Sequence, residues 1–166
     1  AEARQAQEMA WEYAGTEINL QSPKQLQKVL FEDMGLKPTK RTKSGSYTTN
    51  AAALQDLYVK SVDNERANGF LGALLRHREI NKLKQIVQTL IDATNTSDER
   101  IHTTFEQTVA ATGRLSSVDP NLQNIPNRNA AGREIRGVFV PGEGYEALMS
   151  CDYSQVELRI MADLSD

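Results

Sequence analysis

Residues 147–159 read ALMSCDYSQVELR, an apolar run followed by an amphipathic one. Residues 147–151 predict a short buried strand, and Ser154 with Glu157 three residues later predicts a capping box that starts a helix. Asp152 stands between the two. It is either part of the local turn or a carboxylate that the strand directs at a ligand, and spacing alone leaves both explanations open. A strand followed by a helix, in a chain whose first half is helical, indicates an α+β fold.

The composition is that of an ordinary globular chain. Of 166 residues, 39% are hydrophobic and 25% are charged, and no apolar run is long enough to span a bilayer, so neither the disordered nor the membrane class is indicated. The single cysteine, Cys151, cannot form an internal disulfide, and we expect it to be a core residue of the strand. With no leader-like segment at the start, we expect a reducing cytosol.

Charge is segregated along the chain although the net charge is only −3. The first twenty residues and the last 26 are acidic, and three basic islands lie between them. The islands contain Lys37, Lys40, Arg41 and Lys43; Arg76, Arg78, Lys82 and Lys84; and Arg114, Arg128, Arg133 and Arg136. This pattern suggests a polyanion bound in the middle of the chain and a cation near its end.

The first half of the chain predicts helices. Residues 1–15 end at Gly15, Ser22 and Pro23 start a helix over 24–34 that Gly35 stops, and residues 51–60 and 69–93 follow a polar loop at 37–50. A polar break at residues 94–100 predicts a domain boundary. After it we expect a strand over 101–109, no regular element over 111–128, strands over 136–140 and 146–151, and a final helix from Ser154.

A helical wheel of residues 78–91 separates two faces. Ile80, Leu83 and Val87 fall on one face, while Arg78 and Lys82 fall on the other with two polar residues, Gln85 and Thr89. The polar face is either simply solvated or binds phosphates; the cations of the neighbouring loop at 37–43 favour the second.

Residues 112–128, TGRLSSVDPNLQNIPNR, offer the donors that read base edges and phosphates: Arg114, Asn121, Gln123, Asn124 and Arg128. Such contacts suit the minor groove. The alternative is a structural loop whose amides satisfy backbone groups. His77 and His102 have no partner pattern, and no second carboxylate lies at a convincing distance in sequence from Asp152.

Three motifs then carry a resemblance: TGRLSSVDPNLQNIP at 112–126, REIRGVFVP at 133–141 and CDYSQVELRIMADLS at 151–165. Together they closely resemble the family A DNA polymerases, and INLQSPKQLQKVLFEDMGL, KRTKSG and REINKLKQ resemble that family's thumb. The resemblance implies a helical thumb over residues 1–98 and, over 99–166, the first part of a palm with short antiparallel strands.

The resemblance also implies roles for individual residues. Asp152 matches the aspartate that binds both catalytic Mg²⁺ ions, the Tyr153 backbone a further metal contact, and Glu157 the side chain that excludes a 2′-hydroxyl. Arg114 matches an arginine at the primer terminus and counts with Asp152 and Glu157 as catalytic. The expected DNA contacts are Arg78, Lys82, Lys84, Lys40, Arg41, Lys43, Arg114, Asn121, Gln123, Asn124 and Arg128; the expected nucleotide contacts are Tyr153, Ser154, Gln155 and Glu157.

The implied protein is a DNA-directed DNA polymerase of the bacterial cytosol and nucleoid, a monomer that binds primer-template DNA and deoxynucleoside triphosphates in replication and repair. The family's fingers motif and its second catalytic acid would lie beyond residue 166. We therefore expect this chain alone to bind DNA weakly and not to extend a primer. The alternative is a noncatalytic duplex-binding module.

Overall fold

The computed structural model describes residues 1–39, 41, 47–127 and 129–165. It contains two compact units, Ala1–Gln123 and Asn124–Asp166. The fold class is α+β, as predicted, with helices in both units and a two-stranded antiparallel sheet. The units divide at residue 123, whereas the predicted boundary between subdomains lies near residue 98; that boundary stays a prediction. Among the described residues, no helix combines the length and apolar character that a bilayer crossing requires.

The first unit begins with the predicted helices. These are α1 (Glu2–Ala14), α2 (Pro23–Gln27), the π-helix η1 (Lys28–Asp33), α3 (Ala51–Lys60) and α4 (Glu65–Asp92). The predicted stop at Gly15 is confirmed, because this residue has φ 75° and its N–H bonds the Trp11 and Glu12 carbonyls in the last turn of α1. The Ser22 hydroxyl accepts the Gln25 N–H, as predicted for a cap. Asn64 caps α4, which therefore starts four residues before the predicted position.

The predicted helix over residues 24–34 is present with a change of winding. The Met34 N–H bonds the Val29 carbonyl at 2.9 Å, five residues back, and the Leu36 N–H bonds the Leu30 carbonyl at 3.0 Å. Gly35 follows with φ 68°, the left-handed backbone that ends a helix cheaply only at glycine.

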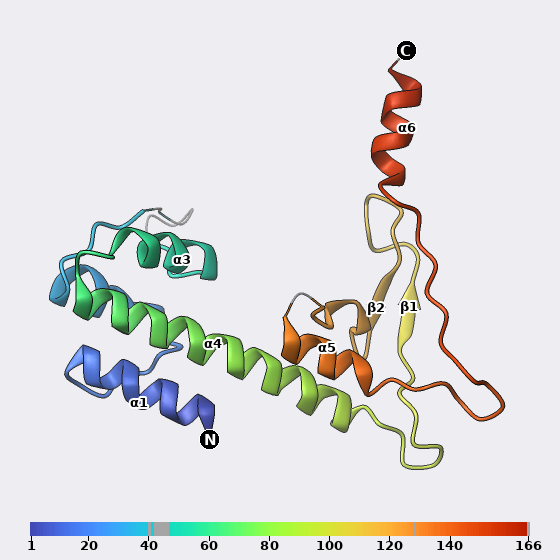
Figure 1. Ribbon diagram of the computed structural model, residues 1–166, viewed down its shortest axis with the longest axis horizontal. Coiled ribbons are helices and arrows are strands. Elements are labelled where there is room, and N and C mark those ends of the chain that lie inside the picture. The colour runs from blue at the N-terminus through green and yellow to red at the C-terminus, as the bar shows by residue number, and fades with distance from the viewer. Residues whose placement is uncertain (40, 42–46, 128, 166) are drawn as a thin grey trace. The chain divides into compact units, whose positions relative to one another are not determined.

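A shared core holds these helices together. α1 and α3 both pack against α4 and flank it in Figure 1. Leu54 of α3 and Phe70 and Leu74 of α4 are fully buried there. The Tyr13 ring of α1 packs directly on Gly69 of α4, where an added Cβ would lie 2.3 Å from the ring. A larger residue at 69 would displace that ring.

The sheet is a short hairpin. β1 (Thr104–Glu106) pairs antiparallel with β2 (Ser116–Val118), so that Phe105 lies opposite Ser117, and the 3₁₀ turn η2 (Leu122–Asn124) follows. The strand predicted over 101–109 is thus present in its middle only. The prediction of no regular element over 111–128 is wrong, because β2 and η2 lie within it: Ser116, Ser117 and Val118 find backbone partners in β1, which a local reading cannot reveal.

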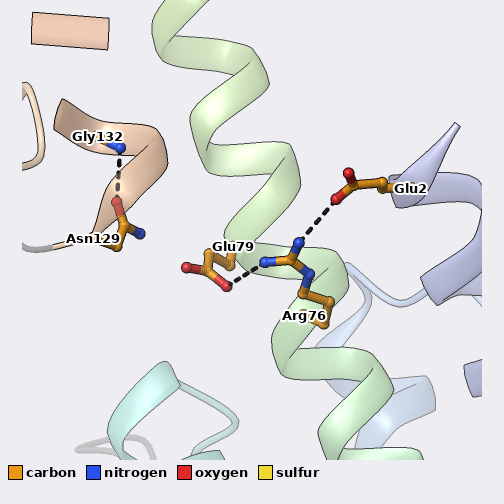
Figure 2. Close-up of polar contacts among 5 residues, drawn as sticks. All are labelled: Glu2, Arg76, Glu79, Asn129 and Gly132. Atoms are coloured by element: carbon orange, nitrogen blue, oxygen red, sulfur yellow. Dashed lines mark hydrogen bonds and ion pairs between the residues drawn. The ribbon is translucent and has the colours of Figure 1, made fainter. Parts of the chain in front are cut away.

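The second unit contains α5 (Ala130–Gly137) and α6 (Val156–Leu164). The strand predicted over 136–140 is wrong: residues 136 and 137 end α5, whose N-terminus is capped by the Asn129 Oδ1 accepting the Gly132 N–H at 2.8 Å (Figure 2). The strand predicted over 146–151 is wrong as well. These residues are exposed and pair with no strand in the described part of the chain, and a strand needs such a partner.

Two local predictions near Asp152 also fail. α6 begins at Val156 and its N-cap is Gln155, with no side-chain capping bond, so the capping box at Ser154 is wrong. Gln155 has φ 52° and ψ 45°, a left-handed conformation in which the chain turns before the helix starts. Cys151 is exposed, not a core residue, because the strand that would have buried it is absent.

Candidate nucleic-acid interface

One face of α4 carries the predicted phosphate contacts. Arg78 and Lys82 are four residues apart, which places them on the same side of a helix. Lys82 is exposed. Arg78 is half-buried, and its Nη1 donates to the Thr49 carbonyl at 2.7 Å, which ties α4 to the end of the loop before α3. Burial lowers the pKa of Arg78 from its usual value, yet an arginine remains a cation at neutral pH.

Lys84 lies on a different side of α4. At 100° per residue, its direction is about 200° from that of Lys82. One phosphate backbone running along α4 therefore cannot lie against both side chains equally. Lys82 is therefore a better candidate than Lys84 for a phosphate contact on the face of α4 that carries Arg78.

Arg76, from the same basic island, is paired with acids. Figure 2 shows its guanidinium between two carboxylates, with Nη2 2.8 Å from the Glu2 Oε2 of α1 and Nη1 3.1 Å from the Glu79 Oε2 of α4. These partners neutralise its charge and link α1 to α4. Arg76 is therefore a structural cation more than a phosphate contact.

Among the described residues of the loop before α3, Arg41 is a predicted DNA contact. Its guanidinium lies 4.7 Å from the Tyr47 ring centroid and donates to the phenol oxygen at 3.1 Å. The Tyr47 ring in turn meets Phe31 edge-on at 5.2 Å between ring centroids, and the Tyr47 carbonyl accepts the Gln27 amide at 2.7 Å. Tyr47 thus connects Arg41 to the helical core. The predicted contacts Lys40 and Lys43 lie outside the described residues.

The hairpin and the turn after it bring three of the predicted minor-groove residues together, Arg114, Asn121 and Gln123. Arg114 precedes β2 and is exposed. The Gln123 Nε2 donates to the Leu115 carbonyl at 3.1 Å, next to Arg114, and the Asn121 Oδ1 accepts the Gln123 N–H at 3.0 Å. Both amides therefore support the loop and still expose polar atoms. Asn124 begins the second unit, and Arg128 lies outside the described residues.

The hydroxyls of buried Ser117 and half-buried Thr103 stabilise this turn, and neither residue was among the predicted site residues. The Ser117 side chain is fully buried, and its Oγ lies 2.7 Å from the Thr103 Oγ1. The Leu122 N–H donates to the Ser117 Oγ at 3.1 Å, and the Thr103 hydroxyl lies 2.8 Å from the Pro120 carbonyl. A serine and a threonine fourteen residues apart gave no signal, because only the strand register brings them into contact.

The two histidines have separate surroundings. His77 is buried on α4, and its Nε2 contacts the Asn81 amide at 2.9 Å. Burial lowers its pKa, and Arg78 lowers it further. His102 is exposed and lies 2.7 Å from an Asp98 carboxylate oxygen. Within the part of the chain that the structure describes, neither belongs to a group of three or more His, Cys, Asp or Glu side chains that could hold a metal ion.

Around the motif at 151–157 the predicted side chains are at the surface. Asp152, Tyr153, Ser154, Gln155 and Glu157 are all exposed. The Arg159 Nε donates to the Ser154 carbonyl at 2.9 Å, which closes the turn before α6. Glu157 borders a shallow apolar hollow on α6 with Ile160, Met161, Leu164 and Ser165.

Comparison with known proteins identifies the family of this chain. The family model described as "DNA polymerase family A" matches residues 1–166. The chain belongs to DNA polymerase family A. DNA polymerase I of Mycobacterium tuberculosis is 57% identical over 162 residues, 98% of this chain and 17% of that protein. DNA polymerase I of Bacillus subtilis is 42% identical, over 99% of this chain and 18% of that protein.

A solved polymerase structure has the same fold. The POL domain of Pol1 from M. smegmatis, in complex with DNA primer-template and dNTP, is 55% identical with a TM-score of 0.90, covering 99% of this chain and 28% of that one. The chain thus spans about a sixth of the length of the curated polymerase I relatives named above.

The described residues do not by themselves form a polymerase metal centre. Within the described ranges, no group of three or more His, Cys, Asp or Glu side chains could hold an ion. Asp152 offers one exposed carboxylate. Two divalent ions about 4 Å apart need further acidic ligands. Divalent-metal use is general in this family, so these residues fit part of such a site and not the whole.

Proposed function

We propose that this chain forms the duplex-binding thumb and the first part of the palm of a DNA-directed DNA polymerase, which extends a primer on a DNA template in replication and repair. The observation that carries the proposal is identity of 57% to a DNA polymerase I over 98% of the chain. The M. smegmatis neighbour, solved with primer-template and dNTP, supports the same two partners here.

The thumb contacts are Arg78, Lys82 and Arg41, which meet the sugar-phosphate backbone without regard to sequence. Arg78 is already anchored by Thr49 and Arg41 by Tyr47, so little side-chain freedom is lost when either meets a phosphate. Lys84, Lys40 and Lys43 are further proposed contacts. Together they supply the electrostatic part of duplex affinity.

The minor-groove contacts are Arg114, Asn121, Gln123, Asn124 and Arg128. In the minor groove each base pair presents acceptors at nearly the same positions, so amide and guanidinium donors test pair shape more than sequence. Arg114 acts at the primer terminus, where it positions the end that reacts.

The palm part contributes to the nucleotide site. Asp152 supplies one carboxylate to the Mg²⁺ ions that the family implies, and the Tyr153 backbone supplies a further contact. Glu157, with Tyr153, Ser154 and Gln155, borders the incoming nucleotide, where Glu157 excludes a 2′-hydroxyl. The enclosing protein is a monomer of the bacterial cytosol.

A chimera tests this proposal. The matching 162 residues of M. tuberculosis DNA polymerase I are replaced by this chain, and primer extension is compared with that of the intact relative. We expect a rate within about tenfold of that relative, a difference of about 1.4 kcal/mol in the barrier. A folded chimera that neither binds nor extends primer-template would contradict the proposal. One that binds and does not extend would favour the duplex-binding module.

A further inference from the structure

Three hydrogen bonds, together with the backbone of residues 120–122, form a closed ring that includes Asn121. It joins four groups: the Leu122 N–H, the Ser117 hydroxyl, the Thr103 hydroxyl and the Pro120 carbonyl. Pro120 and Leu122 are the immediate neighbours of Asn121 in the chain. The two hydroxyls therefore hold the peptide groups on both sides of one exposed residue.

The protons can be distributed around this ring with every member satisfied. The Leu122 N–H donates to the Ser117 Oγ at 3.1 Å. Ser117 then donates to the Thr103 Oγ1 at 2.7 Å, and Thr103 donates to the Pro120 carbonyl at 2.8 Å. Each hydroxyl donates its single proton once. The same two hydroxyls have further acceptors, since the Thr103 Oγ1 lies 3.0 Å from the Val118 carbonyl and the Ser117 Oγ lies 3.2 Å from the Pro120 carbonyl. This density of hydrogen bonds around a buried residue restrains the turn.

The same hydrogen bonds also connect the turn to the sheet. Ser117 is the central residue of β2, and Thr103 immediately precedes β1. The Asn121 side chain itself faces outward and accepts the Gln123 N–H, so its amide nitrogen keeps both N–H donors for another molecule. The turn is thus built so that backbone atoms are fixed inside and amide donors are presented outside.

We propose that Thr103 and Ser117 are positioning residues for DNA recognition by Asn121. This rests on the proposed function, in which Asn121 contacts the minor groove of the primer-template. Fixing Pro120 and Leu122 sets the direction of the Asn121 side chain before DNA arrives, so its ordering costs little on binding. Neither hydroxyl touches DNA; both act through the backbone that carries Asn121.

The experiment is a double-mutant cycle on the whole 166-residue chain, with a fluorescein-labelled primer-template duplex and anisotropy as the readout. Thr103→Val keeps the shape of the side chain and removes its hydroxyl, which leaves the Pro120 carbonyl with the longer 3.2 Å contact to the Ser117 Oγ; Thr103→Ser keeps the hydroxyl. We expect Thr103→Val to weaken affinity about fivefold and Thr103→Ser to restore it to within about twofold.

The second dimension of the cycle is Asn121→Ala. If Thr103 acts through Asn121, adding Thr103→Val to Asn121→Ala weakens binding no further. Equal losses from Thr103→Val in the two backgrounds would overturn the inference and leave the proposed function standing. Asn121→Ala binding as tightly as the unmodified chain would contradict the proposed minor-groove contact itself, and the inference with it.

Ser61→Ala is the matched control. The Ser61 side chain is buried, its hydroxyl donates to the Tyr58 carbonyl at 3.1 Å, and it accepts the Asn68 amide at 3.2 Å. Like the Thr103 hydroxyl, it thus bonds a backbone carbonyl and a second side chain, in the helical part of the same unit. We expect Ser61→Ala and Thr103→Val both to lower the melting temperature, and only Thr103→Val to lower affinity. A matching affinity loss in Ser61→Ala would show that the effect reports stability alone.

Discussion

The helices over residues 2–92 and the segment over residues 138–164 handle their apolar side chains in opposite ways. In the first region Leu54, Phe70 and Leu74 are fully buried between α1, α3 and α4. In the second, Met149 is 89% exposed and Leu164 is 80% exposed. The first region has its packing partners among its own residues, and the second does not find them in the described residues.

This difference separates the residues that stabilise the fold from the residues of the family motif that have proposed roles in chemistry. A helix completes its backbone hydrogen bonds within itself and needs only a partner for its apolar face. A strand needs a neighbour even for its backbone. The residues expected to stabilise the chain therefore lie in 2–92, whereas Asp152 and Glu157 carry proposed chemistry from an exposed stretch.

The largest effect should come from Asp152→Asn, which tests whether a residue of the exposed segment affects the reaction rate and leaves stability and DNA affinity unchanged. In the chimera we expect nucleotide addition to fall at least about 100-fold, because a charge in the proposed nucleotide site is lost. DNA affinity and the melting temperature of the isolated chain should stay unchanged, since Asp152 is exposed. Single-turnover rates are the measurement, and a rate within tenfold would remove Asp152 from that role.

Gly69→Ala probes the opposite region and should act on stability alone. The new Cβ would lie 2.3–2.7 Å from three atoms of the Tyr13 ring, so that ring must leave its place against α4, at a cost of about 2 kcal/mol in the free energy of unfolding. Gly72→Ala is the matched control, because its Cβ would be 3.4 Å from Tyr58. That variant should be neutral, or more stable by up to about 1 kcal/mol. Urea titration gives both values, and equal changes would refute the close packing of Tyr13 on Gly69.

Glu157→Ala should change substrate choice with little change in stability. In the chimera, the ratio of kcat/KM for ribonucleotides over deoxynucleotides should rise at least about tenfold, since the smaller side chain leaves room for a hydroxyl. The N-cap of α6 is Gln155, so the melting temperature should hold. An unchanged ratio with a lower melting temperature would instead assign Glu157 to the helix start.

Lys82→Ala and Lys84→Ala compare two sides of α4. Lys82→Ala should weaken duplex binding several-fold and reduce the slope of log affinity against log salt by about one, on any sequence. Lys84→Ala should do less, because its side chain points about 200° away. Arg78→Ala should resemble Lys82→Ala in binding and also lower the melting temperature, since the bond to Thr49 is lost. A salt series of anisotropy titrations distinguishes them.

The smallest effect concerns pH and the buried His77. Because its pKa is lowered in the folded chain, the unfolded chain binds more protons below about pH 6.5, so stability falls as pH decreases through that range. His77→Gln should lessen this dependence. The exposed His102 provides the control: the His102→Gln chain should keep the His77 contribution. Melting temperatures from pH 5 to 8 test this. An equal fall in melting temperature with decreasing pH in the unmodified, His77→Gln and His102→Gln chains would contradict it.

The sequence predicted the helices because their signals are local. Gly15 and Ser22 act through their own backbone and the next three residues, and the structure uses both as expected. The Asn129 cap of α5 was not among the predicted helix starts, and the strand predicted over 136–140 overlaps the end of that helix. The strand at 146–151 failed for another reason, since pairing depends on residues elsewhere in a sheet.

The candidate site was predictable to a similar extent. Arg78 and Lys82 share a face as their spacing requires, and the same spacing already separated Lys84 from them. The support of Arg78 by Thr49, and of Arg41 by Tyr47, could not be predicted, because each depends on how a loop returns to a helix. The ring of Thr103 and Ser117 depends in the same way on strand register.

Arg66, at the start of α4, binds the end of α1: its Nε donates to the Tyr13 carbonyl at 2.7 Å and its Nη2 to the Ala14 carbonyl at 2.9 Å. A cation at these carbonyls complements the helix dipole. The bonds close a loop of more than fifty residues, whose entropy must be lost before α1 can dock. We therefore expect α1 to join late during folding, after α3 meets α4. In native-state hydrogen exchange, its amides should open together at lower free energy than those around Phe70.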